Sequence, residues 1–288
     1  MKRMVTVLLA FALLLSLAGC KKHDAGTPTQ TDPQPTQQAA PQPLPQLPNL
    51  EAVTVTGKET AGRAPGGEYT LPEKLSTLME WQWNGAVALL AQEEDVAFYA
   101  TEGKESNPGL LCWGDSQAEF DWWYMTPRSI DPQLWYDDID GDGEKEVLFS
   151  GYGASGTGVS MEYFYVVERG EDGTLTSIEL PWNDVCKAIE AQMQIVEGDG
   201  SVYAALAKDV VDITATLEEL KLTANDVEVY LGAVTDYEWK DGELHYTFGV
   251  MLDGEKIPIA TVYVGEVTGT IVYAEGRFTL DGLYFSPM

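Results

Sequence analysis

Short runs of apolar and β-branched residues recur along the chain, each closed by glycine, asparagine, proline or aspartate. Such runs are typical of strands, and the polar clusters between them are typical of tight turns. The runs lie at Val96 to Ala100, Leu110 to Trp113, Phe120 to Met125, Glu146 to Ser150, Met161 to Glu168, Val202 to Leu206 and Val210 to Thr214. This pattern predicts a mainly β protein with minor α, of the α+β class, built from antiparallel sheets and hairpins.

The C-terminal part of the chain continues this pattern as a β-meander. Its strands are expected at Val227 to Trp239, Leu244 to Leu252, Ile257 to Val267 and Thr270 to Phe278. The connections Lys240-Asp241-Gly242 and Asp253-Gly254 contain the Asp-Gly pair that favours hairpin turns. Consecutive strands should therefore pair with one another here.

One segment repeats its apolar residues at helical spacing instead. These residues are Val185, Ile189, Met193 and Val196. Asn183 can serve as N-cap, and Asp184 would lie at the positive end of the helix dipole. The sequence therefore predicts one amphipathic helix near residues 184–197. Shorter helical patterns lie at Leu75 to Trp83 and at Thr216 to Leu220.

The N-terminus has the three regions of a secretory signal peptide: Lys2 and Arg3, the apolar run Met4 to Leu17, and small residues before Cys20. The tetrapeptide Leu17-Ala18-Gly19-Cys20 resembles the lipobox of bacterial lipoproteins. The resemblance implies a signal peptide of residues 1–19, lipid such as palmitate on Cys20, and anchoring at the extracytoplasmic face of the bacterial cell membrane. A signal cleaved without lipidation and an uncleaved anchor are the alternatives.

The signal is followed by a segment rich in Pro, Gln and Thr, which cannot bury a core. We expect residues 20–65 to form an extended tether. Residues 66–180 would then form a β-rich domain, and residues 181–288 a helix with the meander, either as a second domain or as a continuation of the first.

Charge restricts the partners of the protein. The formal net charge is −29 and the pI is about 4.1, so the surface repels nucleic acid and anionic lipid headgroups. We expect no nucleic-acid partner, and membrane contact only through the lipid anchor.

The spacing of acidic residues in one loop dictates a specific chemistry. Asp138, Asp140 and Asp142 place carboxylates at every second position, which lets them converge on a hard cation when the loop curls. Gly143 permits the sharp turn that presents the carbonyl of Glu144. An acidic solvated turn without metal is the alternative.

The residues after this loop exclude an EF-hand. In an EF-hand, the twelfth residue of the loop is a bidentate Glu. Counting from Asp138, the twelfth residue here is Phe149, in a run typical of a strand. From Leu134 to Glu168 the chain therefore resembles the strand-loop-strand calcium motif of FG-GAP and VCBS-type repeats, in a single copy. The resemblance implies a structural calcium ion held by a ring of oxygens from Asp138, Asp140, Asp142, the carbonyl of Glu144, and Glu146.

Aromatic residues are concentrated just before the loop. They either form core and cross-strand pairs or line a surface for an extracellular glycan or protein ligand, and the candidates for that surface are Trp122, Trp123 and Trp135. Since Trp122 and Trp123 are adjacent, only one of them can face such a surface. The glycine-rich stretch at residues 151–158 is expected to be a bulged hairpin connection.

No arrangement of residues selects a catalytic chemistry. With two histidines in the whole chain, nucleophilic triads and zinc sites have little support. Cys112 and Cys186 could pair or remain free thiols. We expect a non-catalytic binding or interaction module; the alternatives are a carbohydrate-active hydrolase with a carboxylate pair and a calcium-responsive envelope sensor.

Overall fold

The computed structural model describes residues 42–73, 87–101, 108–124, 131–257 and 262–288. Within these ranges the chain is mainly β, with α2 (Trp182–Glu190), α3 (Thr214–Leu220) and the short 3-10 helix η1 (Ala224–Asp226). The predicted fold class is therefore confirmed. No helix in the described part is long and apolar enough to cross a bilayer. The signal peptide, Cys20 and the expected helix at 75–83 lie outside the described residues.

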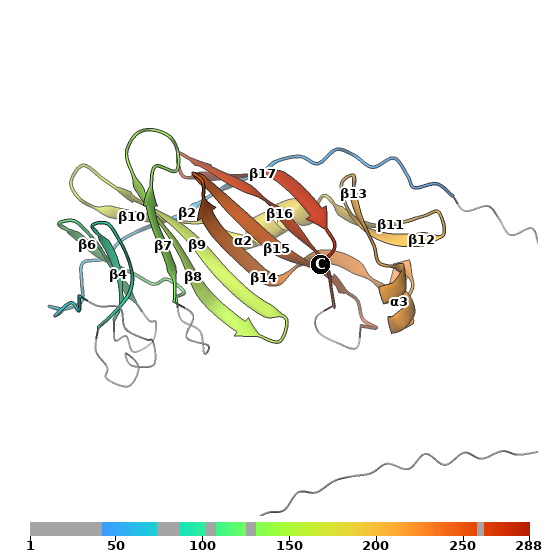
Figure 1. The fold of residues 1–288 in the computed structure, drawn as a ribbon, viewed down its shortest axis with the longest axis horizontal. Coiled ribbons are helices and arrows are strands. Elements are labelled where there is room, and N and C mark those ends of the chain that lie inside the picture. The colour runs from blue at the N-terminus through green and yellow to red at the C-terminus, as the bar shows by residue number, and fades with distance from the viewer. Residues whose placement is uncertain (1–41, 74–86, 102–107, 125–130, 258–261) are drawn as a thin grey trace, which may run out of the picture. The chain divides into compact units, whose positions relative to one another are not determined.

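Ten strands form the largest sheet. Its order is β1 (Val53–Thr56), β17 (Arg277–Ser286), β16 (Val262–Ala274), β15 (Glu243–Asp253), β14 (Glu228–Lys240), β9 (Val159–Arg169), β10 (Leu175–Glu179) and β2 (Lys58–Ala61), with β8 (Glu146–Gly156) paired to β9 and β7 (Gln133–Asp137) paired to β8. β9 connects the two halves: it pairs with β8 and β10, and with β14 through one parallel pair, Ser160 with Val234. The sheet thus takes strands from both sides of residue 180 (Figure 1).

Two smaller sheets complete the described fold. One contains β3 (Ala88–Glu93), β4 (Val96–Ala100), β5 (Gly109–Trp113) and β6 (Ser116–Phe120), and the other contains β11 (Met193–Gly198), β12 (Ser201–Leu206) and β13 (Asp209–Asp212). Both are antiparallel. β4, β5, β12 and β13 lie where the sequence predicts strands, whereas β3, β6 and β11 do not.

The central residues of β8, β9 and β10 are buried on both faces of the sheet. Leu148 of β8 belongs to the larger hydrophobic core, whereas its neighbours Val147 and Phe149 belong to a second core shared with β3–β6. Because successive side chains of a strand point to opposite faces, a strand between two cores is apolar at every position. This explains the uninterrupted apolar run after Glu146.

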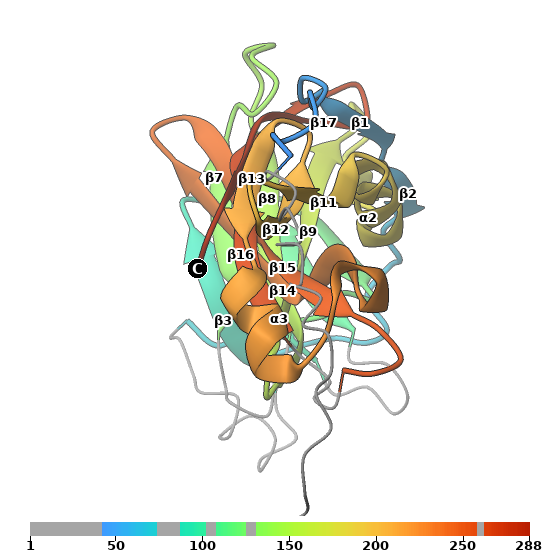
Figure 2. The same ribbon diagram turned by 90° about the vertical axis from the view of Figure 1, so that its right-hand side faces the viewer.

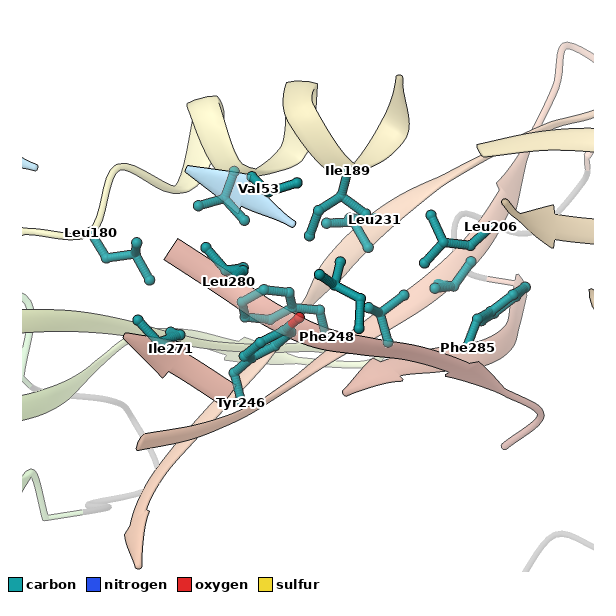
Figure 3. Close-up of a cluster of buried hydrophobic side chains, with 14 of the residues drawn as sticks. Val53, Leu180, Ile189, Leu206, Leu231, Tyr246, Phe248, Ile271, Leu280 and Phe285 are labelled. Atoms are coloured by element: carbon teal, nitrogen blue, oxygen red, sulfur yellow. The ribbon is translucent and has the colours of Figure 1, made fainter. Parts of the chain in front are cut away.

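The larger core fills the space between the inner face of β14–β17 and the elements α2, β1 and β12. Figure 3 shows the side chains of Val53, Ile189 and Leu206 facing those of Phe248 and other residues of the sheet. α2 lies against β1 and β14, and Figure 2 shows it beside β1. Val185 and Ile189 supply the buried face of this helix, as its helical spacing predicts.

The expected helix at 184–197 is too long. α2 ends at Glu190, and Met193 and Val196 belong to β11, where Met193 pairs with Leu206 of β12. Pairing with a distant strand thus overrides a local helical spacing. The residue at the N-cap position is Pro181, with no capping side chain, rather than Asn183. Similarly, α3 begins at Thr214 rather than at Thr216.

The first two strands of the expected meander are confirmed as β14 and β15. The boundary between the next two strands, expected near residues 268–269, is wrong. β16 continues through residues 268–269, and the hairpin turn lies at Glu275-Gly276. Gly269 is not a turn residue: a Cβ there would lie 2.7 Å from the hydroxyl of Tyr246, so the glycine leaves room for that ring. Leu252 of β15 pairs with Val262 of β16, so Asp253-Gly254 does not form a two-residue hairpin turn between these strands.

The segment expected as a tether includes part of the fold. β1 pairs with β17 and β2 pairs with β10, although both fall within residues 20–65. The carbonyl of Gln42 accepts a hydrogen bond from the main-chain N–H of Asp199 at 2.6 Å. The chain is therefore docked on the sheets well before residue 65.

Candidate metal centre

The acidic loop connects two neighbouring strands, as the sequence predicts. β7 ends at Asp137 and β8 begins at Glu146, and these two residues pair across the ladder. The pairing brings the two ends of the acidic loop, residues 138–145, together. Glu146 therefore lies at the base of the loop although it is eight positions beyond Asp138.

Carboxylates of the loop hold its backbone in a tight curl. Asp138 accepts hydrogen bonds from the main-chain N–H groups of Gly141 and Gly143 at 2.7 and 3.0 Å. Asp140 accepts one from Asp142 at 3.1 Å, and Asp142 accepts one from Glu144 at 2.8 Å. Gly143 has a φ of 97°, which disfavours any side chain. The DxDxDG spacing thus specifies the curl before any ion is considered.

Three carboxylates meet at one point of this curl. Asp138, Asp140 and Glu146 each place one oxygen so that the three lie within 4.8 Å of one another. The Asp142 carboxylate lies outside this group, and the resemblance assigns to the exposed Glu144 only its main-chain carbonyl. The structure therefore brings together three of the five expected ligands through their side chains.

The electrostatics of the loop favour a cation. Glu146 is 7% exposed, and burial raises its pKa to about 7; the N–H of Ile139 opposes that change, and the charges of Asp140, Asp142 and Asp138 add to it. The ammonium of Lys145 points elsewhere, 2.8 Å from Glu94 and over the ring of Tyr136. Within the described residues, none of the expected ligands forms an ion pair.

Two contacts that position the loop could not be anticipated from the local motif. The N–H of Ile139 donates to Glu146 at 3.1 Å, which fixes the buried carboxylate. The indole Nε1 of Trp239 on β14 donates to Asp137 at 3.1 Å. The second contact joins residues 102 positions apart, and only the alternation of β14 could have suggested that Trp239 points inward.

The donor set fits a hard divalent cation. All the convergent groups are oxygens, which calcium prefers, and no sulfur or imidazole group belongs to the cluster. Asp138, Asp140 and Glu146 would hold such an ion, and its charge would offset the repulsion between these carboxylates.

The three candidate tryptophans occupy different environments. Trp122 is buried in the second core and donates its Nε1–H to Ser177 at 3.0 Å, so it is a core residue. Trp135 on β7 is half-buried and packs against the larger core. Trp123 is 57% exposed. β6 ends at Phe120, so Trp122 and Trp123 lie after the strand rather than on it as predicted.

The remaining expectations concern a hairpin and two thiols. Residues 151–156 belong to β8, with a bulge between Tyr152 and Ala154, and β9 follows after a tight turn, so the bulged hairpin is confirmed.

Cys112 and Cys186 are free thiols. Burial raises the pKa of Cys112 to about 11, which keeps it protonated at neutral pH.

The chain matches no protein-family model, no curated protein and no solved structure. Function must therefore be argued from the site itself.

Proposed function

We propose that this chain is a lipid-anchored binding module of the extracytoplasmic face of the bacterial membrane, stabilised by calcium in the acidic loop. One observation carries the calcium part: oxygens of Asp138, Asp140 and Glu146 lie within 4.8 Å of one another, with Glu146 buried at the base of the loop. Without a cation, these charges oppose the pairing of β7 with β8.

The role of calcium is structural. Extracellular calcium sites have dissociation constants of about 10⁻⁴ to 10⁻³ M, so about 1 mM free calcium would stabilise the folded state by roughly 0.4–1.4 kcal/mol. That energy can order one loop, whereas burial of the hydrophobic cores provides most of the stability.

The membrane anchor is proposed from the Leu17-Ala18-Gly19-Cys20 tetrapeptide. Two or more acyl chains give stable anchoring, whereas a single chain gives only marginal binding. Changing Cys20→Ser should therefore move the protein from the membrane fraction to the soluble fraction of expressing cells. Retention of the variant in the membrane fraction would contradict lipid anchoring at this residue.

Calcium binding is tested by thermal unfolding with 1 mM calcium and with a chelator. The wild type should melt at a higher temperature with calcium. Asp140→Asn should lose the difference, because it keeps a hydrogen-bond acceptor for the N–H of Asp142 but removes a charged ligand. Glu144→Ala is the matched control in the same loop, since only its main-chain carbonyl is assigned to the ion. Identical wild-type curves with calcium and with chelator would overturn the proposal.

The binding role is supported by Trp123, a large aromatic side chain that is 57% exposed although most aromatic residues of this region are buried. Exposed aromatics of this kind commonly serve recognition. Turnover of any polysaccharide or peptide in a screen would contradict the binding role and indicate a hydrolase.

A further inference from the structure

We propose that Trp123 and Tyr163 form the stacking platform of a binding site for an uncharged oligosaccharide. This inference deepens the proposed binding role and does not depend on the calcium site. It rests on the geometry of the two rings, on the strand beneath them and on the polar groups beside them.

The two rings form an ordered pair. Their centroids lie 6.0 Å apart with an interplanar angle of 25°, which is a stacked arrangement. Tyr163 is half-buried on β9 and supports one side of the indole, while Trp123 is 57% exposed. A rigid, supported indole surface suits stacking against the C–H face of a sugar ring, because little conformational entropy is lost on binding.

The strand beneath the pair has no side chains where the pair lies on it. A Cβ at Gly151 would lie 2.0 Å from the carbonyl oxygen of Trp123, and a Cβ at Gly153 would lie 2.3 Å from the ring of Tyr163. Two glycines of β8 thus let the backbone of Trp123 rest directly on the sheet. The main-chain N–H of Trp123 also faces the hydroxyl of Tyr165, at 3.5 Å. The indole is therefore held outward by its backbone rather than left outside the core by chance.

Two charged groups lie on the same face of the sheet as the aromatic pair. Glu179 of β10 pairs with Tyr165 of β9, and Lys58 of β2 pairs with Glu179, so these side chains share the face that carries Tyr163. Lys58 and Glu179 form an ion pair at 3.1 Å. Tyr165 itself is buried in the second core, so Lys58 and Glu179 flank the aromatic pair at the edge of that core.

The charge of the protein indicates which glycans this site can bind. The chain carries a formal charge of −29, which repels anionic glycans, and the charged groups of this surface, Lys58 and Glu179, compensate each other. Within the described residues, the groups beside the aromatic pair therefore offer stacking and hydrogen bonding, and their one ion pair carries no net charge. Those are the requirements of a neutral sugar chain.

The test is affinity electrophoresis of the protein in gels containing dextran, mannan, xyloglucan, mixed-linkage β-glucan or polygalacturonate. At least one neutral polysaccharide should retard the wild type, and polygalacturonate should not. Trp123→Ala should weaken the retardation at least tenfold in apparent affinity, and Tyr163→Phe should weaken it less because the stacked ring remains. Tyr284→Ala is the matched control, since Tyr284 is also 57% exposed but lies on β17.

The proposal is overturned if no neutral polysaccharide retards the wild type, or if Trp123→Ala and Tyr284→Ala bind equally well. It is also overturned if Trp123 is needed only for retention on an immobilised apolar peptide, which would make the surface a protein-docking site. Thermal unfolding of each variant with calcium and with chelator separates the two proposals: Trp123→Ala should retain the full calcium effect, whatever its glycan affinity.

Discussion

Glu162 is a buried carboxyl group whose ionisation should set the pH dependence of stability. It is 4% exposed on β9 and accepts a hydrogen bond from the hydroxyl of Ser150 at 2.6 Å. Its main-chain N–H and carbonyl both bond to the hydroxyl of Thr235, at 2.7 and 2.8 Å, where β9 meets β14. Burial raises its pKa from 4.5 to about 7; hydrogen bonds from Ser150, Tyr152 and the N–H of Tyr237 oppose this, and the charge of Asp236 adds to it.

The raised pKa gives a stability term with a definite sign. In the unfolded chain the carboxyl ionises near pH 4.5, whereas in the folded protein it keeps its proton up to about pH 7. The folded state thus binds more protons between these values, so this contribution is full below pH 4.5 and is lost as pH rises to about 7. The difference corresponds to about 3 kcal/mol at most, at 1.36 kcal/mol per pH unit.

Glu162→Gln should remove this term. Relative to the wild type, the variant should gain about 1 kcal/mol at pH 5 and about 3 kcal/mol by pH 8, because the glutamate of the unfolded chain ionises above pH 4.5 whereas glutamine is neutral in both states. The assay is urea unfolding at several pH values in constant calcium, followed by tryptophan fluorescence. Glu238→Gln is the control, since it removes an exposed carboxylate from the neighbouring β14. Wild type and Glu162→Gln with the same pH profile would refute the reasoning.

Three further predictions concern the loop and the layer beneath it. Trp239→Phe keeps a ring but removes the donor to Asp137, so titration calorimetry should show calcium binding weakened several-fold with little change in melting temperature. Gly143→Ala has free space for its Cβ but a φ of 97°, so urea unfolding should show a loss of about 1 kcal/mol, and calorimetry weaker calcium binding. Leu148→Ala should cost about 2–5 kcal/mol in urea unfolding, because the side chain is fully buried; a loss below 1 kcal/mol would contradict the two-core arrangement.

The sequence predicts those parts of the fold that are determined locally. The turn Asp241-Gly242 has both residues at positive φ, as its composition requires, and the strands that it joins pair over most of their length. Errors arise where distant contacts decide. Met193 continues a helical spacing but pairs with Leu206, and Gly269 resembles a break but makes room for Tyr246. Such contacts are not visible in a local window of sequence.

The candidate site is predictable to the same extent. The alternate aspartates and Gly143 specify the curl of the loop, because their effects act over two to five residues. The burial of Glu146 and its bond to Ile139 depend on the packing of β8 between two cores, which the loop sequence does not encode. The same holds for the tryptophans: Trp122 and Trp123 are adjacent and equally aromatic, and only the tertiary fold buries one and exposes the other.

The position of the acidic loop explains how a weakly bound cation could stabilise more than the loop itself. β8 follows the loop directly, and its next residues, Val147 and Leu148, lie in different cores. The loop carboxylates repel Glu146, which is the first residue of β8. This repulsion opposes the burial of the β8 side chains that follow, on both faces of the strand. A bound cation would remove this repulsion at the start of β8, and the loop would therefore couple a small binding energy to a strand whose residues belong to both cores.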